Sequence, residues 1–409
     1  MFKKSVSLLI ILTLVFSSFV YAEEETLTVD KAIEMATEDQ SSIEDINDAI
    51  EKMWDGYYAA KAGKRQIEAT LSTLDRFEEL YDKKYKDGES LDAFETMELE
   101  GYQLAFGDEP PNYTGQEMLD NFIRTRDLTW KSVYSEIQKT KNQRSTIMLS
   151  IEKATRDLYN QVVSLQTTLS QQEVYLGISR TQHEQLVLKH SLGQVSDADL
   201  KNSEQNLMIL EKQIEQISIN LDTLEMNFNS LIDATVTQKF IFTDTVDTLT
   251  VEPTHKKLDE YLEAAIINRV EVKNARIDLG VKEREDSIIK NYLKNELLTD
   301  RVNADIALIT ATYALEQAEV TVIDNISDGY ISMMTYWNDY QLSLESLELS
   351  KNNLADIEKR FELGQVTQTT VDLTTFSVLT AENTVKSNLR NYLNAVDKMD
   401  KASGNGPAY

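Results

Sequence analysis

The chain has 409 residues, four prolines, thirteen glycines, no cysteine and a formal net charge of −28. The acidic excess, with no basic face on any long segment, excludes a nucleic-acid-binding protein, because such proteins displace counterions from phosphates with lysine and arginine. The absence of cysteine excludes disulfides and thiolate metal ligands. Few helix breakers among abundant Glu, Lys, Gln, Ala and Leu predict a mainly helical protein.

The N-terminus has the pattern of a secretory signal peptide over residues 1–22. Lys3 and Lys4 precede an apolar run that is shorter than the roughly 20 residues of a membrane-spanning helix. Val20-Tyr21-Ala22 then provides a small-residue cleavage site. No cysteine follows that site, so the pattern does not fit a lipoprotein. We therefore expect an exported protein of the cell envelope, in the periplasm or at the outer membrane.

The next segment, Leu27–Ala36, is expected to begin extended and to continue as a helix capped by Asp30. A long helix should follow and end at Gly88, residues 107–113 read as a loop, and residues 116–149 are helical in pattern again. The first long helix has an apolar face at three- and four-residue spacings or their sum, formed by Ile67, Leu71, Leu74, Tyr81 and Tyr85.

The most regular apolar pattern in the chain predicts a coiled-coil seam. Its spacings alternate between three and four residues, which is the 3.5-residue period of knobs-into-holes packing. The residues of this first seam are Leu207, Leu210, Ile214, Ile217, Leu221, Leu224, Phe228 and Leu231. A second seam follows near the C-terminus at Val378, Ala381, Val385, Leu389, Tyr392, Val396 and Met399, with Tyr340, Leu344, Leu347, Leu354 and Phe361 on the preceding arm.

Each seam is preceded by nearly the same turn. The first turn contains Gly193-Gln194-Val195 and the second contains Gly364-Gln365-Val366, 171 positions later. At this offset Asp157 matches Asp328, Tyr159 matches Tyr330 and Asn220 matches Asn391, which indicates an internal repeat. A glycine just past a helix favours a left-handed stop, and Ser196 or Thr367 can cap the next helix. The turn chemistry alone would fit any antiparallel helix pair, but its duplication in register favours two related hairpins.

These patterns predict an all-α fold of long antiparallel helical hairpins in two structural repeats with coiled-coil packing. At most two short strands are expected near the middle, at Lys239–Thr243 and Thr248–Glu252, before Pro253. The predicted domains are the signal peptide at 1–22, a first helical repeat at 23–235, a linker with the strands at 236–256, a second helical repeat at 257–403 and a disordered tail at 404–409.

Residues for catalysis or metal binding are scarce. The three histidines are not spaced i, i+4 on one helix face, and no nucleophile-elbow or phosphate-loop spacing occurs. The run Asp324–Gly329 departs from a calcium loop because Ile326 takes a ligand position and Thr335 stands where the bidentate Glu belongs. We therefore predict no catalytic residue, no metal site and no cofactor, and the protein is not expected to be an enzyme.

Three features together resemble the TolC family of outer-membrane efflux proteins. They are the Leu27–Ala36 opening, the paired Arg/Lys-x-x-Leu-Gly-x-Val-Ser/Thr turns, and Leu258–Glu271, where Val270 replaces the usual proline. Their order covers most of residues 27–403. The resemblance implies a homotrimer in which each chain supplies two repeats to a long helical duct. It also implies docking on a periplasmic adaptor protein and an inner-membrane pump, with both turns at the periplasmic tip.

The family's tip also carries acids that constrict the entrance. Asp199 matches such a position in the first repeat, whereas its counterpart in the second is Thr370, with Asp372 out of register. The alternative role for Asp199 is an acid that caps the following helix, where a negative charge is ordinarily stabilising. Both roles stay open at this point.

The segments that should form membrane strands depart from the family pattern. Family members insert two strand pairs per chain into a shared barrel, and each strand needs ~9–11 residues of alternating character. Residues 75–148 and 290–325 occupy those places, and neither alternates. We therefore predict a divergent member with helices in place of the usual barrel strands, and contact with an outer membrane stays open.

Two functions are compatible with this pattern. One is an exported TolC-like duct component of an efflux or type I secretion system. The other is an extracytoplasmic helical scaffold or adaptor that kept the repeats but conducts nothing. A duct needs a polar, acid-lined inner surface along its arms, and a solvated outer face has the same sequence pattern.

Overall fold

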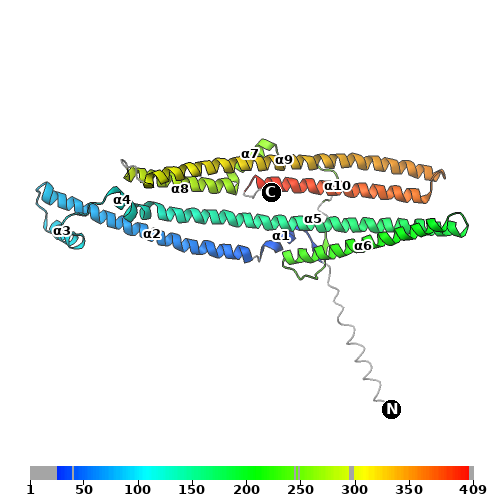
Figure 1. The fold of residues 1–409 in the computed structure, drawn as a ribbon, viewed down its shortest axis with the longest axis horizontal. Helices are drawn as coiled ribbons and strands as arrows, with labels where there is room; N and C mark the ends of the chain where they lie inside the picture. The colour runs from blue at the N-terminus through cyan, green and yellow to red at the C-terminus, as the bar shows by residue number, and fades with distance from the viewer. Residues whose placement is uncertain (1–24, 39–40, 244–245, 247–248, 294–298, 405–409) are drawn as a thin grey trace, which may run out of the picture. The chain divides into compact units, whose positions relative to one another are not determined.

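The computed structural model describes residues 25–38, 41–243, 246, 249–293 and 299–404. Within these residues the chain is mainly helical, with several long helices and two three-residue strands, which confirms the all-α prediction (Figure 1). The predicted signal peptide at 1–22 and residues 405–409 of the predicted tail lie outside the described residues.

Two short strands and a series of helices follow one another along the described residues. They are β1 (Glu25–Leu27), α1 (Val29–Glu38), α2 (Ser41–Tyr81), the π-helical stretch η1 (Asp82–Lys86), α3 (Ala93–Phe106), α4 (Gly115–Met118), the π-helical stretch η2 (Leu119–Thr129), α5 (Trp130–Ser191), α6 (Asp197–Leu231), β2 (Phe240–Phe242), α7 (Leu258–Asn268), α8 (Val270–Tyr292), α9 (Thr299–Glu362) and α10 (Gln368–Ala402).

The chain forms two compact units, and each draws on both halves of the sequence. The first unit comprises the residues up to Glu38, Glu152–Leu249 and Ser346–Thr384. The second comprises Asp39–Ile151, Thr250–Glu345 and the residues from Val385 onward. Helices α5, α9 and α10 therefore contribute to both units, so the compact units do not coincide with the sequence repeats.

In the first unit, the predicted seam is the buried side of α6. All eight of its residues are buried or half-buried, and Phe228 is fully buried, whereas Met208 and Ile219 between them are exposed. Arg180 of α5 pairs with Glu211 of α6 at 2.8 Å, which fixes the two arms as an antiparallel hairpin (Figure 1). The 3.5-residue period thus identified the packed face correctly.

The seam of α10 repeats that of α6 in register. Val378, Val385, Tyr392 and Met399 each lie 171 positions after a residue of the first seam, and all four are buried. On the α9 arm, Tyr340 and Leu347 are buried as predicted. Phe361 was assigned to the same arm but is 39% exposed, and it lies one residue before the end of α9 at Glu362.

The two strands pair in parallel and join distant parts of the chain. Glu25 aligns with Phe240 and Leu27 with Phe242. The buried hydroxyl of Tyr159 on α5 donates to the Leu27 carbonyl at 2.6 Å, and the Thr243 N–H donates to that hydroxyl at 3.0 Å. The predicted strand at 239–243 is therefore confirmed in its central residues, with the N-terminal strand as its partner.

The second predicted strand is wrong over its described residues. Residues 249–252 are not in a strand. Two tyrosine hydroxyls, and not a neighbouring strand, accept hydrogen bonds from backbone N–H groups near this segment. Tyr340 accepts from the Val251 N–H at 3.1 Å, and Tyr392 accepts from the Thr254 N–H at 3.0 Å. An extended segment can meet its backbone hydrogen-bond needs in this way without a sheet.

The expected cap of the first helix is also corrected. Helix α1 begins at Val29, so Asp30 lies inside its first turn. Thr28 takes the capping position instead: the Lys31 N–H donates to its hydroxyl at 3.3 Å and the Ala32 N–H to its carbonyl at 3.0 Å. Asp30 still lies where a negative charge favours the helix N-terminus.

In the second unit, the segments that replace the barrel strands are helical in their described residues. Residues 75–148 contain the end of α2, then α3, α4, η2 and the start of α5, and residues 290–325 contain the end of α8 and the start of α9. The first long helical run, formed by α2 and η1, ends just before Gly88, as predicted, and Gly88 has φ of +68°. Gly115 is required by a close approach, because a Cβ there would clash with the backbone carbonyl of Tyr292.

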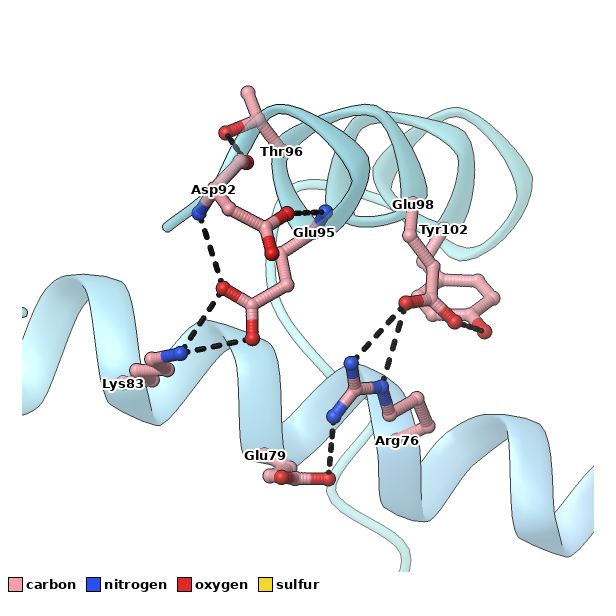
Figure 2. Close-up of polar contacts among 8 residues, drawn as sticks. All are labelled: Arg76, Glu79, Lys83, Asp92, Glu95, Thr96, Glu98 and Tyr102. Atoms are coloured by element: carbon pink, nitrogen blue, oxygen red, sulfur yellow. Dashed lines mark hydrogen bonds and ion pairs between the residues drawn. The ribbon is translucent and has the colours of Figure 1, made fainter. Parts of the chain in front are cut away.

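Two ion pairs, Lys83–Glu95 and Arg76–Glu98, hold helix α3 against η1 and α2, and we call them the polar clasp (Figure 2). Lys83 Nζ lies 2.8 Å from Glu95 Oε1, and Glu95 also accepts the Asp92 N–H in a capping box at the start of α3. Arg76 donates to Glu98 at 3.3 Å. The hydrogen bond from Lys83 is the main cause that lowers the pKa of Glu95, and its counterpart raises the pKa of Lys83.

Candidate functional site: the two helix-hairpin turns

The two glycine turns that the sequence singled out have the same backbone structure. Gly193 has φ of +72° and Gly364 has φ of +70°. The Gly193 N–H donates to the His190 carbonyl at 2.9 Å, and the Gln194 N–H donates to the Lys189 carbonyl at 2.9 Å. The second turn repeats both bonds, so each is a Schellman motif that satisfies the last carbonyls of its helix.

The side chains of the turns are placed alike in the two copies. Val195 and Val366 are half-buried, whereas Gln194 and Gln365 are exposed. The valine thus anchors the turn to its hairpin and leaves the glutamine in solvent. Both turns belong to the first unit, where Thr369 Oγ1 and Gln185 Oε1 of different hairpins lie 3.3 Å apart.

The helix that follows each turn is capped by the predicted hydroxyl. The Asp199 N–H donates to Ser196 Oγ at 3.2 Å, and the Thr370 N–H donates to Thr367 Oγ1 at 3.3 Å. The Ser196 hydroxyl also donates to the Asp199 carboxylate at 2.6 Å. Asp199 therefore takes part in capping α6, which is the alternative role that the sequence left open for it, and it remains exposed.

The two turns differ in charge. His190 Nε2 lies 2.5 Å from Asp197 Oδ1 at the first turn. The corresponding positions of the second turn, 171 residues later, are Phe361 and Gln368. Gln368 instead donates to Asp372 Oδ1 at 2.8 Å. The first turn is thus the more polar of the two, while the backbone scaffold is shared.

Each turn also exposes a leucine that was not among the predicted site residues. Leu192 is 64% exposed and Leu363 is 72% exposed, and they occupy the same place before the glycine in both copies. A leucine left in solvent at both tips contributes little to the core of its own hairpin. The repeated Leu-Gly pair was the sequence signal that could have identified these residues as part of the site.

The described residues contain no cluster of three or more His, Cys, Asp or Glu side chains that could hold a metal ion. Each turn thus presents an exposed leucine next to an exposed glutamine, and the two copies match in this respect.

Helix α9, which contributes to both units, has an exposed apolar stretch. By length and composition alone, α9 is the one helix within the described residues that could cross a membrane, and little of its most apolar stretch is buried.

The arrangement of these helices matches solved membrane proteins over nearly the whole chain. A membrane protein from Pseudomonas aeruginosa has a TM-score of 0.61 and 11% identity, and the match covers 94% of this chain and 91% of that one. The outer membrane protein VceC from Vibrio cholerae has a TM-score of 0.55 and 12% identity, with 92% and 96% covered. The open MtrE outer membrane channel of Neisseria gonorrhoeae gives 0.52 and 12%, with 92% and 89% covered.

The fold is TolC-like. No protein-family model matches the sequence, and no curated protein matches it significantly. The resemblance first carried by the turns and by Leu27–Ala36 is therefore confirmed at the level of the fold. In this TolC-like fold, Gly193 and Gly364 end the first arms of two register-matched hairpins.

Proposed function

We propose that the protein is an exported duct component of an efflux or type I secretion system. In this proposal it acts as a homotrimer in the cell envelope, joined at its two turns to a periplasmic adaptor and an inner-membrane pump. It performs no catalysis of its own. The observation that carries the proposal is the pair of equivalent turns, each with a left-handed glycine and an exposed leucine, on a TolC-like fold.

The equivalence of the two turns supports a docking role over a purely structural one. The glycine and the capping hydroxyl stabilise each turn, but the stability of the turn does not depend on the exposure of Leu192 and Leu363. A partner that covered both leucines would remove apolar surface from water at each tip, which stabilises a complex by about 25 cal/mol per Å² before association costs. A partner with repeated binding surfaces could engage both turns alike.

Transport in the native organism tests this proposal. We expect that a strain lacking the gene accumulates an efflux substrate such as a fluorescent dye, and that the wild-type gene restores export. The double variant Leu192→Asp/Leu363→Asp should fold but fail to restore export. Leu349→Asp is the matched control, because Leu349 is 70% exposed on α9, away from both turns.

A measurement of the assembled particle separates a duct from a scaffold. We expect the mature chain to purify as a trimer with a hollow axis by electron microscopy. A solid or monomeric particle, together with normal dye export in the deletion strain, would favour the non-conducting scaffold and would overturn the proposal.

A further inference from the structure

A groove lies between the start of α5 and the middle of α8, within the second unit. Beyond one end of it, Asn142 of α5 donates to Asn274 of α8 at 2.7 Å. Beyond the other end, Ile288 of α8 belongs to a buried apolar cluster with Ile123 of η2. Between these two contacts the helices leave a cavity of about 430 Å³, which we call the α5–α8 groove.

The walls of the α5–α8 groove are largely apolar. The apolar side chains that line it are Leu128 of η2, Trp130 and Tyr134 of α5, and Ile277 and Val281 of α8. The ring of Trp130 and the aliphatic side chains of α8 thus provide surface against which a hydrocarbon group can be removed from water.

A glycine keeps part of the groove open. Gly280 of α8 lines it, and a Cβ built on this residue would meet nothing within 4 Å. A glycine inside a helix is destabilising relative to alanine, and no close approach of another residue requires one here. Its effect is therefore on the groove itself, because a larger side chain at this position would occupy the space between the helices.

The charged residues that line the α5–α8 groove are all cations. They are Lys131 of α5 and Arg276 and Arg284 of α8, with no carboxylate among the described residues that line it. The chain as a whole has 69 acidic and only 41 basic residues, so a groove of this charge runs against the composition. Arg276 pairs with Glu319 at 3.1 Å, whereas Lys131 and Arg284 form no ion pair within the part of the chain that the structure describes.

The register of the two helices places Lys131 and Arg284 at the same end of the groove. Asn142 contacts Asn274, and Lys139, one turn earlier on α5, pairs with Asp278, one turn later on α8, at 2.8 Å. The helices therefore run antiparallel with the same rise per residue. Continuing this register back to Lys131 brings it level with Arg284 to within one helical turn.

We propose that the α5–α8 groove binds a single-chain organic anion with an apolar body, such as a fatty-acid carboxylate. Lys131 and Arg284 bind the carboxylate, and the hydrocarbon chain lies over Gly280 between the apolar walls. Burial of the chain supplies affinity, and the two cations select a negative head group. The volume of about 430 Å³ is near the lower end of the ~300–1,000 Å³ typical of small-molecule sites, which suits one alkyl chain better than two.

The charges of the groove decide against other amphiphiles of the same length. A cationic or neutral head group would leave Lys131 and Arg284 without a counter-charge, and a cationic one would also be repelled by them. The inference goes beyond the proposed function and does not depend on it, because binding to the groove can be measured whether or not the protein transports anything.

Isothermal titration calorimetry of the full-length protein tests the proposal with laurate, kept below its micelle concentration. We expect saturable binding of laurate at one site per chain. Dodecyltrimethylammonium has an alkyl chain of similar length and the opposite charge, and it should bind at least about tenfold more weakly.

A pair of charge variants tests the head-group site. Lys131→Gln/Arg284→Gln should weaken laurate binding about tenfold or more, because the carboxylate loses both of its cationic partners. Arg65→Gln/Lys201→Gln is the matched control, since it removes the same charge from two exposed positions outside the groove. The control should bind laurate as the parent does.

A pair of glycine variants tests the site of the hydrocarbon chain. Gly280→Leu fills the groove without changing any charge, so we expect it to abolish laurate binding. Gly177→Leu is the matched control, because Gly177 is also helical with open space around it but lies outside the groove. Circular dichroism establishes that each variant is folded.

Three results would contradict this assignment. One is the absence of saturable laurate binding to the parent protein. Another is equal affinity for laurate and dodecyltrimethylammonium, which would mean that the head-group charge is not recognised. The third is unchanged laurate binding by a folded Gly280→Leu protein, which would place the ligand elsewhere. If Gly280→Leu does not fold, the charge variant decides, and parent-like affinity of Lys131→Gln/Arg284→Gln would exclude the groove.

Discussion

Gly193 and Gly364 adopt nearly the same left-handed backbone, with φ of +72° and +70°, although 171 residues separate them. A Cβ built on either glycine would meet nothing within 4 Å. Steric crowding by other residues therefore does not explain the glycine at either position. The requirement comes from the backbone itself, because a left-handed residue closes the Schellman motif.

Alanine at either turn should therefore destabilise the protein through backbone strain alone. We expect Gly193→Ala and Gly364→Ala each to lower the free energy of unfolding by about 1–2 kcal/mol, measured by urea denaturation. Gly177→Ala in α5 is the matched control, since that glycine is helical and also has open space around it. The control should raise stability by about 0.5–1 kcal/mol. Equal effects at all three positions would contradict the role assigned to the turns.

The hydroxyl of Tyr159 joins the parallel strand pair to α5, and its removal should be measurable. Tyr159→Phe leaves the Leu27 carbonyl and the Thr243 N–H without this partner in a buried place, so we expect a loss of about 1–3 kcal/mol of unfolding free energy. Tyr58→Phe, at a residue that is 63% exposed, should change stability little. A Tyr159→Phe protein as stable as the parent would show that water replaces the hydroxyl.

Periodicity and turn chemistry predicted the parts of this fold that depend on local sequence. The 3.5-residue spacing from Leu207 to Leu231 identified the buried side of α6, and the repeated Leu-Gly-Gln-Val sequence located both turns. The lack of alternation in residues 75–148 and 290–325 predicted helices there. Each of these features is set by residues close together in the chain.

Features that depend on distant partners were predicted less well. The β-propensity of Thr248–Glu252 is real, but Tyr340 supplies a hydrogen-bond partner from 89 positions away. Thr28 and Asp30 are both good caps, and the pairing of Leu27 in β1 keeps the backbone extended up to Thr28. Val302, Ile306, Ile309 and Tyr313 have the three- and four-residue spacing of a helical face, but a buried face and an exposed one have the same spacing.

The packed seam should be sensitive to a cavity at its most buried residue. Phe228 is fully buried, and its ring centroid lies 6.0 Å from that of Tyr159. We expect Phe228→Ala to cost about 3–5 kcal/mol in guanidinium denaturation, from lost burial and the cavity that remains. Met226→Ala is the control, at a residue that is 47% exposed on the same helix. Similar losses from both variants would mean that the seam has been placed on the wrong face.

The clasp between Lys83 and Glu95 should make the attachment of α3 sensitive to acid. The hydrogen bond from Lys83 lowers the pKa of Glu95, so the folded state binds a proton there less readily than the unfolded chain does. The stabilisation by Glu95 is thus fully present above the unfolded pKa of about 4.3 and is lost as the pH falls through the lower folded pKa. Lys83, whose pKa is raised, keeps its contribution until the pH rises through that folded value.

Urea denaturation of the parent and of Glu95→Gln at several pH values measures this effect. We expect the difference in unfolding free energy between them to be constant near neutral pH and to shrink below about pH 4, where the parent carboxylate becomes protonated. Glu100→Gln, on the exposed side of the same helix, is the control and should show a small difference that does not follow this course. If the Glu95→Gln difference stays constant down to about pH 2, well below the unfolded pKa, the ion pair seen in Figure 2 does not hold α3 against η1 in solution.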